Sequence, residues 1–185
     1  MQIDDPVLAQ HVPGPLWDFL RDDCHLPPAA FTLRAGAELP EPARRLLAHT
    51  RDMTTTLATH HESLIRIEVL QCRETSGFYL REVFLRTLAA GTLVEYGVVA
   101  IDLGQFNAWQ RDLIRAGQAP LGALLHRFEI PFVSTPIGFF ALTGAHLAAT
   151  PLATPAPATC HGRFNRLARE SGEPLAWILE VLPPA

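Results

Sequence analysis

Two charged residues lie in sequence patterns that are typical of buried strands. In the stretch GFYLREVFLR, an extended chain places Arg81 on the same face as Tyr79 and Val83. Glu180 has the equivalent place in the last apolar segment, where it shares a face with Ile178. A guanidinium stays charged in practice, so a buried one needs anions or hydrogen-bond acceptors from the protein or from a ligand.

These two residues allow two interpretations. Arg81 and Glu180 could pair with each other across the sheet, as buried opposite charges often do. Alternatively, they could lie a ligand's width apart. Arg81 would then hold an anion, while Glu180 hydrogen-bonds or protonates a hydroxyl or ether oxygen. The residues alone leave both interpretations open.

The stretch GQAPLGALL indicates a second group that could bind an anion. A helix that begins at Pro120 presents the free backbone N–H groups of Leu121 and Gly122 at its positive end, and Gly122 leaves room for a ligand there. Together with an inward-facing arginine, this helix start predicts a clamp for a carboxylate.

Other kinds of site find little support in the sequence. The adjacent pairs His60–His61 and Cys160–His161 lack the spacing of a zinc site, and we interpret these histidines as solvated loop residues. There is no G-x-S-x-G elbow and no glycine-rich phosphate loop. We therefore expect no metal and no cofactor.

Length, composition and charge predict a single domain that spans residues 1–185. The chain has 48% hydrophobic residues, a formal net charge of −4, and three widely spaced cysteines. No cluster of basic residues predicts binding to nucleic acid or to an anionic membrane surface. With no signal peptide or membrane-spanning run in the sequence, we expect a cytoplasmic protein, and a monomer.

The apolar patterns predict an α+β fold. The first 40 residues are helical in pattern and broken by prolines, and a turn at ESGEP predicts a C-terminal hairpin within 162–183. We expect a mostly antiparallel sheet of about six strands with helices packed on one face and a flap that closes an internal pocket. The expected segments are strands at 53–57, 63–72, 78–86 and 93–102, helices at 104–117 and 119–128, and a covering flap at 134–160.

Four separate motifs, in order and spacing, resemble those of chorismate pyruvate-lyases, the enzymes that make 4-hydroxybenzoate. They are RDMTTTL around Met53, YLREVFL around Arg81, APLGALL around Leu121, and GRFNRL followed by SGEPLAWILEVLP with Glu180. The resemblance covers residues 42–183 and leaves 1–40 as a divergent N-terminal segment.

The resemblance implies a carbon–oxygen lyase without a cofactor, whose partners are chorismate and its product. Arg81 and Glu180 would be catalytic: Arg81 would grip the ring carboxylate, helped by main-chain N–H groups at Met53 and Leu121, and Glu180 would face the ring oxygen. Loss of pyruvate makes the ring aromatic, so orientation and assistance near the ether oxygen would suffice. Arg163 and Arg166 are additional pocket candidates without an assigned role, since the sequence departs from the family pattern around them.

Other functions remain open from the sequence. A lyase could act on a modified chorismate, and a degenerate family member could serve as an interaction module. The runner-up is a non-catalytic domain of the related fold of bacterial transcription regulators, which would sense a small molecule such as an aromatic carboxylate. Such sensors usually accompany a DNA-binding domain, and the first 50 residues lack a basic recognition helix. The sequence therefore favours the lyase.

Overall fold

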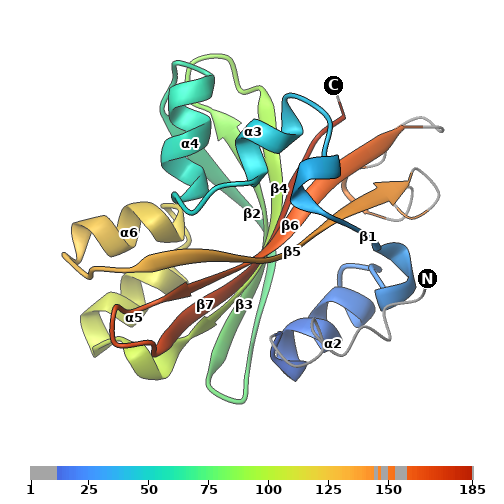
Figure 1. Cartoon of the computed structure of the whole chain (residues 1–185). Coiled ribbons are helices and arrows are strands. Elements are labelled where there is room, and N and C mark those ends of the chain that lie inside the picture. The colour runs from blue at the N-terminus through green and yellow to red at the C-terminus, as the bar shows by residue number, and fades with distance from the viewer. Residues whose placement is uncertain (1–11, 144–145, 147–149, 153–157, 185) are drawn as a thin grey trace.

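A seven-stranded antiparallel sheet forms the centre of the protein (Figure 1). The computed structural model describes residues 12–143, 146, 150–152 and 158–184. In sheet order, the strands are β1 (Thr32–Arg34), β5 (Val133–Thr143), β6 (Thr159–Ala168), β7 (Pro174–Leu182), β4 (Leu93–Asp102), β3 (Phe78–Thr87) and β2 (Ile65–Thr75).

The alternating pattern of the central strands sorts their side chains onto two faces. On β3, Leu80 and Phe84 belong to the core on one face, whereas Tyr79 belongs to the core on the other face, which Arg81 shares. A tight turn fixes this register. Ser76 and Gly77, with φ of 51° and 83°, join β2 to β3 in a conformation that glycine favours.

Helices cover both faces of the sheet (Figure 1). As expected, the helices from α3 to α6 gather on one face, but α2 packs Leu16, Phe19 and Leu20 onto the opposite face. The bounds are α2 (Gly14–Asp22), α3 (Ala43–Leu47), α4 (Met53–His60), α5 (Ala108–Arg115) and α6 (Leu121–Arg127), with short 3-10 turns η1 (Pro28–Ala30), η2 (Gly36–Glu38) and η3 (Leu103–Gln105).

Two segments differ from the sequence prediction. The stretch MTTTL, expected as a strand, forms α4, because the Asp52 side chain caps the helix by accepting a hydrogen bond from the Thr55 N–H at 2.8 Å. The first part of the expected flap is the strand β5, which pairs along β6 despite a register shift next to Pro136. The rest of the expected flap lies largely outside the described residues.

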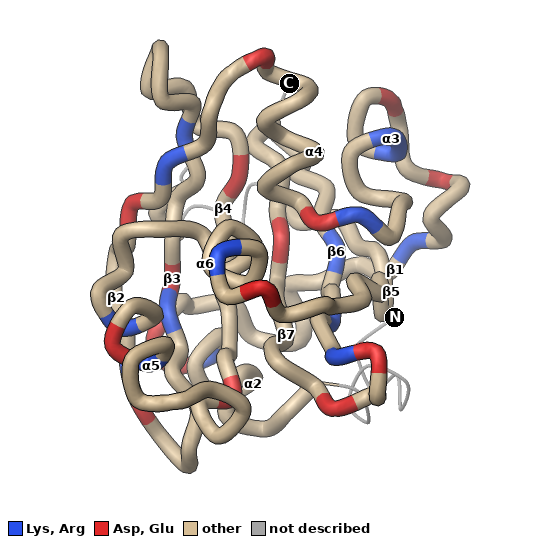
Figure 2. The backbone as a smooth tube through the Cα atoms, turned by 90° about the vertical axis from the view of Figure 1, so that its left-hand side faces the viewer, with Lys and Arg blue, Asp and Glu red and all other residues tan. Residues whose placement is uncertain are grey.

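Charged residues of both signs are interspersed around the fold (Figure 2). Short-range pairs between exposed side chains account for several of them, such as Arg21 with Asp18 and Arg115 with Glu74. Over the described ranges, we find no helix with the length and apolar character needed to cross a membrane.

Candidate functional site

A buried cavity lies between the sheet and the N-terminal ends of α4 and α6. Its volume is about 60 Å³, which is room for several water molecules at about 10–15 Å³ each. Apolar side chains from the central strands form most of its wall, and polar groups gather at two ends. The lining residues are Asp52, Met53, Thr54, Ile67, Arg81, Val83, Leu85, Glu95, Gly97, Val99, Pro120, Leu121, Gly122, Asn165, Leu167, Ile178 and Glu180.

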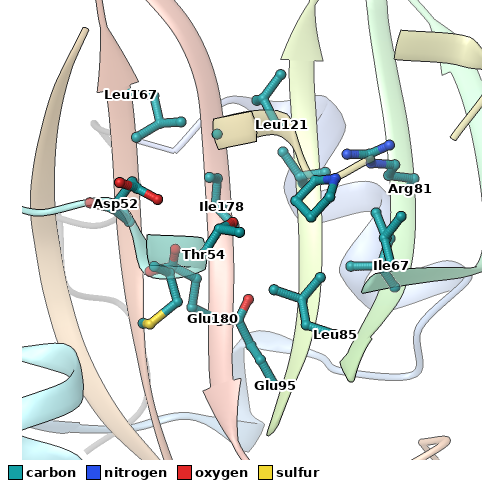
Figure 3. Close-up of a pocket in the computed structure, with 17 residues that line it drawn as sticks. Asp52, Thr54, Ile67, Arg81, Leu85, Glu95, Leu121, Leu167, Ile178 and Glu180 are labelled. Carbon is teal, nitrogen blue, oxygen red and sulfur yellow. The ribbon is translucent and has the colours of Figure 1, made fainter. Parts of the chain in front are cut away.

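Arg81 provides a buried positive charge at one end of the cavity (Figure 3). The residue is 2% exposed, and its Nη2 donates one long hydrogen bond of 3.4 Å to the Ala119 carbonyl. Its Nε and Nη1 have no hydrogen-bond partner among the described residues. Burial lowers the pKa of Arg81 to about 10, so the side chain is still charged at neutral pH.

Glu180 is at the other end and is already paired with a different arginine. Arg163 lies directly opposite Glu180 on the neighbouring strand, and its Nε donates a hydrogen bond to Glu180 Oε2. The Nη1 of Arg163 also donates to the carbonyls of Leu47 and His49, at 2.7 and 2.8 Å. The pair therefore connects the sheet to the segment between α3 and α4.

Arg81 and Glu180 do not pair with each other, although they share a face. Arg81 is aligned with Val99 on β4, and Glu180 is aligned with Gly97 from the far side of β4. Two strand spacings and two residues of rise separate their Cα atoms by roughly 12 Å. The interpretation as a cross-sheet pair is therefore wrong, and the two residues lie at opposite sides of the cavity (Figure 3).

Glu95 is a pocket residue that the sequence analysis missed. It is 3% exposed, lines the cavity next to Glu180, and its Oε2 has no hydrogen-bond partner within the described part of the chain. Burial, and then the negative charge of Glu180, raise the pKa of Glu95 well above its usual range. The alternation that identified Arg81 could have found it, since Glu95 shares a face with Val99 in the stretch LVEYGVVAID.

The starts of two helices meet at the cavity. Met53 is the first residue of α4 and Leu121 is the first residue of α6, so Pro120 is the N-cap instead of the first helical residue. A Cβ added at Gly122 would lie 3.4 Å from Asp52 Oδ1, which shows how closely the two helix starts approach. Backbone N–H groups in the first turn of a helix have no partner within that helix.

The sequence candidates are thus divided between several places. Met53, Arg81, Leu121, Gly122 and Glu180 line the cavity. Arg163 is fully buried and contacts the cavity only through Glu180. Arg166 points to the face that α2 covers, because it follows the core residue Phe164 by two positions on β6.

Metal chemistry has no evident place in the described residues, where no group of three or more His, Cys, Asp or Glu side chains could hold an ion. The cavity instead offers a charged guanidinium at one end and carboxyl groups at the other, with apolar walls between them. Such an arrangement suits an organic anion.

No known family model matches the chain, and no curated protein has a similar sequence. Several solved structures resemble the fold. PhnF from Mycobacterium smegmatis matches with a TM-score of 0.52 and 10% identity, over 73% of this chain and 64% of PhnF. The effector domain of PhnF matches with a TM-score of 0.52 and 10% identity, over 71% and 88% of the two chains. Gene product SA0254 from Staphylococcus aureus matches with a TM-score of 0.52 and 12% identity, over 74% and 90%.

The expectation of a carbon–oxygen lyase is corrected by these findings. The fold is the expected chorismate lyase-like α+β fold, but the similar structures are PhnF and its effector domain, which point to ligand binding without catalysis. The site agrees, because Glu180 is engaged in an ion pair with Arg163. The argument from the first 50 residues also fails, since an effector domain is itself a separately solved unit in PhnF.

Proposed function

We propose that this chain is a small-molecule-binding domain of the effector type and that its ligand is a carboxylate held by Arg81. The observation that supports this most directly is the buried guanidinium of Arg81, with two nitrogen atoms unpartnered among the described residues. A buried charge without a counter-ion is costly, and a bound carboxylate would offset that cost with charge-assisted hydrogen bonds.

The rest of the cavity favours a ring-containing ligand. Between Arg81 and Glu180, the wall consists mainly of aliphatic side chains: Ile67, Val83, Leu85, Val99, Leu121, Leu167 and Ile178. A flat aromatic or alicyclic body would bury apolar surface against them, at about 25 cal/mol for each Å². Gly97, which has no side chain, lies on the floor of the cavity and leaves room for that body.

Backbone groups would assist Arg81. The first turns of α4 and α6 point their N–H groups towards the cavity end of each helix, where negative charge is favoured. In this proposal, Met53 and Leu121 contribute main-chain N–H groups to the ligand. Gly122 allows close approach.

Calorimetry with matched ligands would test the proposal. We expect benzoate to bind the purified protein and benzamide, its uncharged analogue, to bind at least about 10-fold more weakly. Arg81→Met should weaken benzoate binding by about 10- to 100-fold, because it removes charge-assisted hydrogen bonds. Arg86→Gln is the matched control, since Arg86 is on the same strand but does not line the cavity.

Two results would contradict the proposal. One is equal binding of benzoate and benzamide, which would show that the site does not recognise charge. The other is benzoate binding that Arg81→Met leaves unchanged while Arg86→Gln abolishes it, which would place the anion at the protein surface.

A further inference from the structure

A second buried group faces the cavity without a partner. The Oε2 of Glu95 has no hydrogen bond within the described ranges, and the carboxyl group is directed into the cavity (Figure 3). A Cβ added at Gly97 would lie 3.3 Å from Glu95 Oε1, so this oxygen also borders the open floor of the cavity. Glu95 is thus the counterpart of Arg81: a buried polar group whose hydrogen-bonding capacity is unused.

The surroundings of Glu95 are set by the strands and the helix that pack against it. From β7, Glu180 is its diagonal neighbour at a Cα separation of about 7–8 Å. From β6, Arg163 is present, but its Nε donates to Glu180. From β3, the facing residues near Glu95 are Val83 and Leu85, and Arg81 lies four positions before Leu85, the residue aligned with Glu95.

The helix α4 adds no cation to this end. Its lining residues are Met53 and Thr54, with the carboxylate of Asp52 at the helix start. The charges of Arg163 and Glu180 balance each other, so nothing among these groups would stabilise a second negative charge on Glu95. Burial and Glu180 accordingly raise the pKa of Glu95 well above its usual range.

We propose that Glu95 forms the second recognition end of the cavity and that its carboxyl group hydrogen-bonds an uncharged oxygen of the ligand. This inference rests on the proposed function, since it assumes a carboxylate at Arg81. A neutral carboxyl has one O–H donor and acceptor oxygens, so it can engage a hydroxyl, an ether or a carbonyl group. The ligand class is therefore a monocarboxylate with a neutral oxygen at its opposite end.

The same arrangement excludes dicarboxylates. A second carboxylate at this end would lie beside the carboxylate of Glu180, whose arginine partner is already used. Like charges in a buried site disfavour each other strongly. A monoanion with a hydroxyl group meets no such repulsion.

Three para-substituted benzoates of similar length would test this inference by calorimetry. We expect 4-hydroxybenzoate to bind the parent protein about 5- to 30-fold more tightly than 4-methylbenzoate, which has a methyl group in place of the hydroxyl. Terephthalate, the dicarboxylate, should bind at least about 10-fold more weakly than 4-methylbenzoate. Glu95→Gln keeps a neutral hydrogen-bonding group and should keep the preference for the hydroxyl, whereas Glu95→Met should abolish it.

The outcomes separate this inference from the proposed function. If all carboxylates bind through Arg81 but Glu95→Met keeps the full preference for 4-hydroxybenzoate, only the role of Glu95 is wrong. If none of these ligands binds the parent protein, the proposed function fails and the inference fails with it. Binding of 4-methylbenzoate to Glu95→Met serves as the internal control for a folded site.

Discussion

Arg163 and Glu180 lie directly opposite each other on β6 and β7 and form an ion pair with side-chain exposures of 0% and 3%. This pair explains why two charged residues on the same face have different roles. Glu180 has its counter-ion within the protein. Arg81 has none among the described residues, and its guanidinium is the group left for a ligand.

The ion pair predicts a large loss of stability when Arg163 is removed. In Arg163→Met, Glu180 would remain as a buried charge, and the carbonyls of Leu47 and His49 would lose their donor. We expect the free energy of unfolding to fall by about 3–5 kcal/mol, measured by urea denaturation. Adding Glu180→Leu to this variant should recover part of the loss. A loss below about 1 kcal/mol in the single variant would contradict the buried pair.

The opposite effect is expected for Arg81. Because its charge is buried without a counter-ion among the described residues, Arg81→Met should leave the ligand-free protein equally stable or raise its free energy of unfolding by about 1–2 kcal/mol. The apolar neighbours Val83 and Val99 can accommodate the methionine. Urea denaturation without ligand would measure this, and a destabilisation above about 2 kcal/mol would show instead that Arg81 has a structural role.

Glu95 predicts a dependence of stability on pH. Its pKa is higher in the folded protein than the ordinary value of 4.5, so its contribution to stability is complete below that value and is lost as pH rises towards the folded-state pKa. Glutamine does not titrate. The free energy of unfolding of Glu95→Gln minus that of the parent should therefore increase from mildly acidic to mildly alkaline pH.

Glu173→Gln provides a control of the opposite sign. A hydrogen bond from the Ser171 hydroxyl lowers the pKa of Glu173 in the folded state, so this carboxylate contributes stability above its ordinary value. The group is fully exposed, and the effect should be small. A pH-independent difference for Glu95→Gln would contradict a neutral Glu95.

Two glycines should respond differently to alanine. At Gly122, an added Cβ meets Asp52 Oδ1 at an ordinary distance of 3.4 Å, so stability should change little or rise by about 0.5–1 kcal/mol through helix propensity. Benzoate binding should weaken by about 2- to 10-fold, because the methyl group narrows the approach to the N–H groups of α6. Calorimetry and urea denaturation of the same variant would separate the two effects.

Gly162 is the matched comparison. An added Cβ would lie 2.5 Å from the Glu180 carbonyl oxygen and 2.5 Å from the Phe140 ring, so Gly162→Ala should destabilise the protein by about 1–3 kcal/mol or more. If Gly122→Ala destabilised the protein as much as Gly162→Ala, the gap between the starts of α4 and α6 would not be as open as described.

The sequence predicts the central strands well because their period of two is unambiguous. The same alternation identified Arg81 and Glu180 as inward-facing. It was not applied to Glu95, whose neighbours in the chain are equally apolar. Arg163 could not be assigned as the partner of Glu180 from the sequence, because that depends on the register between β6 and β7.

The errors in the fold prediction have local causes. The three threonines after Met53 favour a strand by propensity, but the Asp52 cap and the packing of Met53 and Leu57 into the core make a helix. Pro136 and Gly138 disguised β5 as a flap, although the strand tolerates them at a register shift.

The most direct test of the central claim is to observe the guanidinium of Arg81 by NMR while benzoate is added to isotope-labelled protein. The Nε–H resonance of Arg81 can be identified by its absence in Arg81→Lys. We predict that benzoate shifts this resonance in a saturable way and that benzamide does not. If benzoate saturates its binding site while the Arg81 resonance stays unchanged, the carboxylate is not held by Arg81 and the proposed function is wrong.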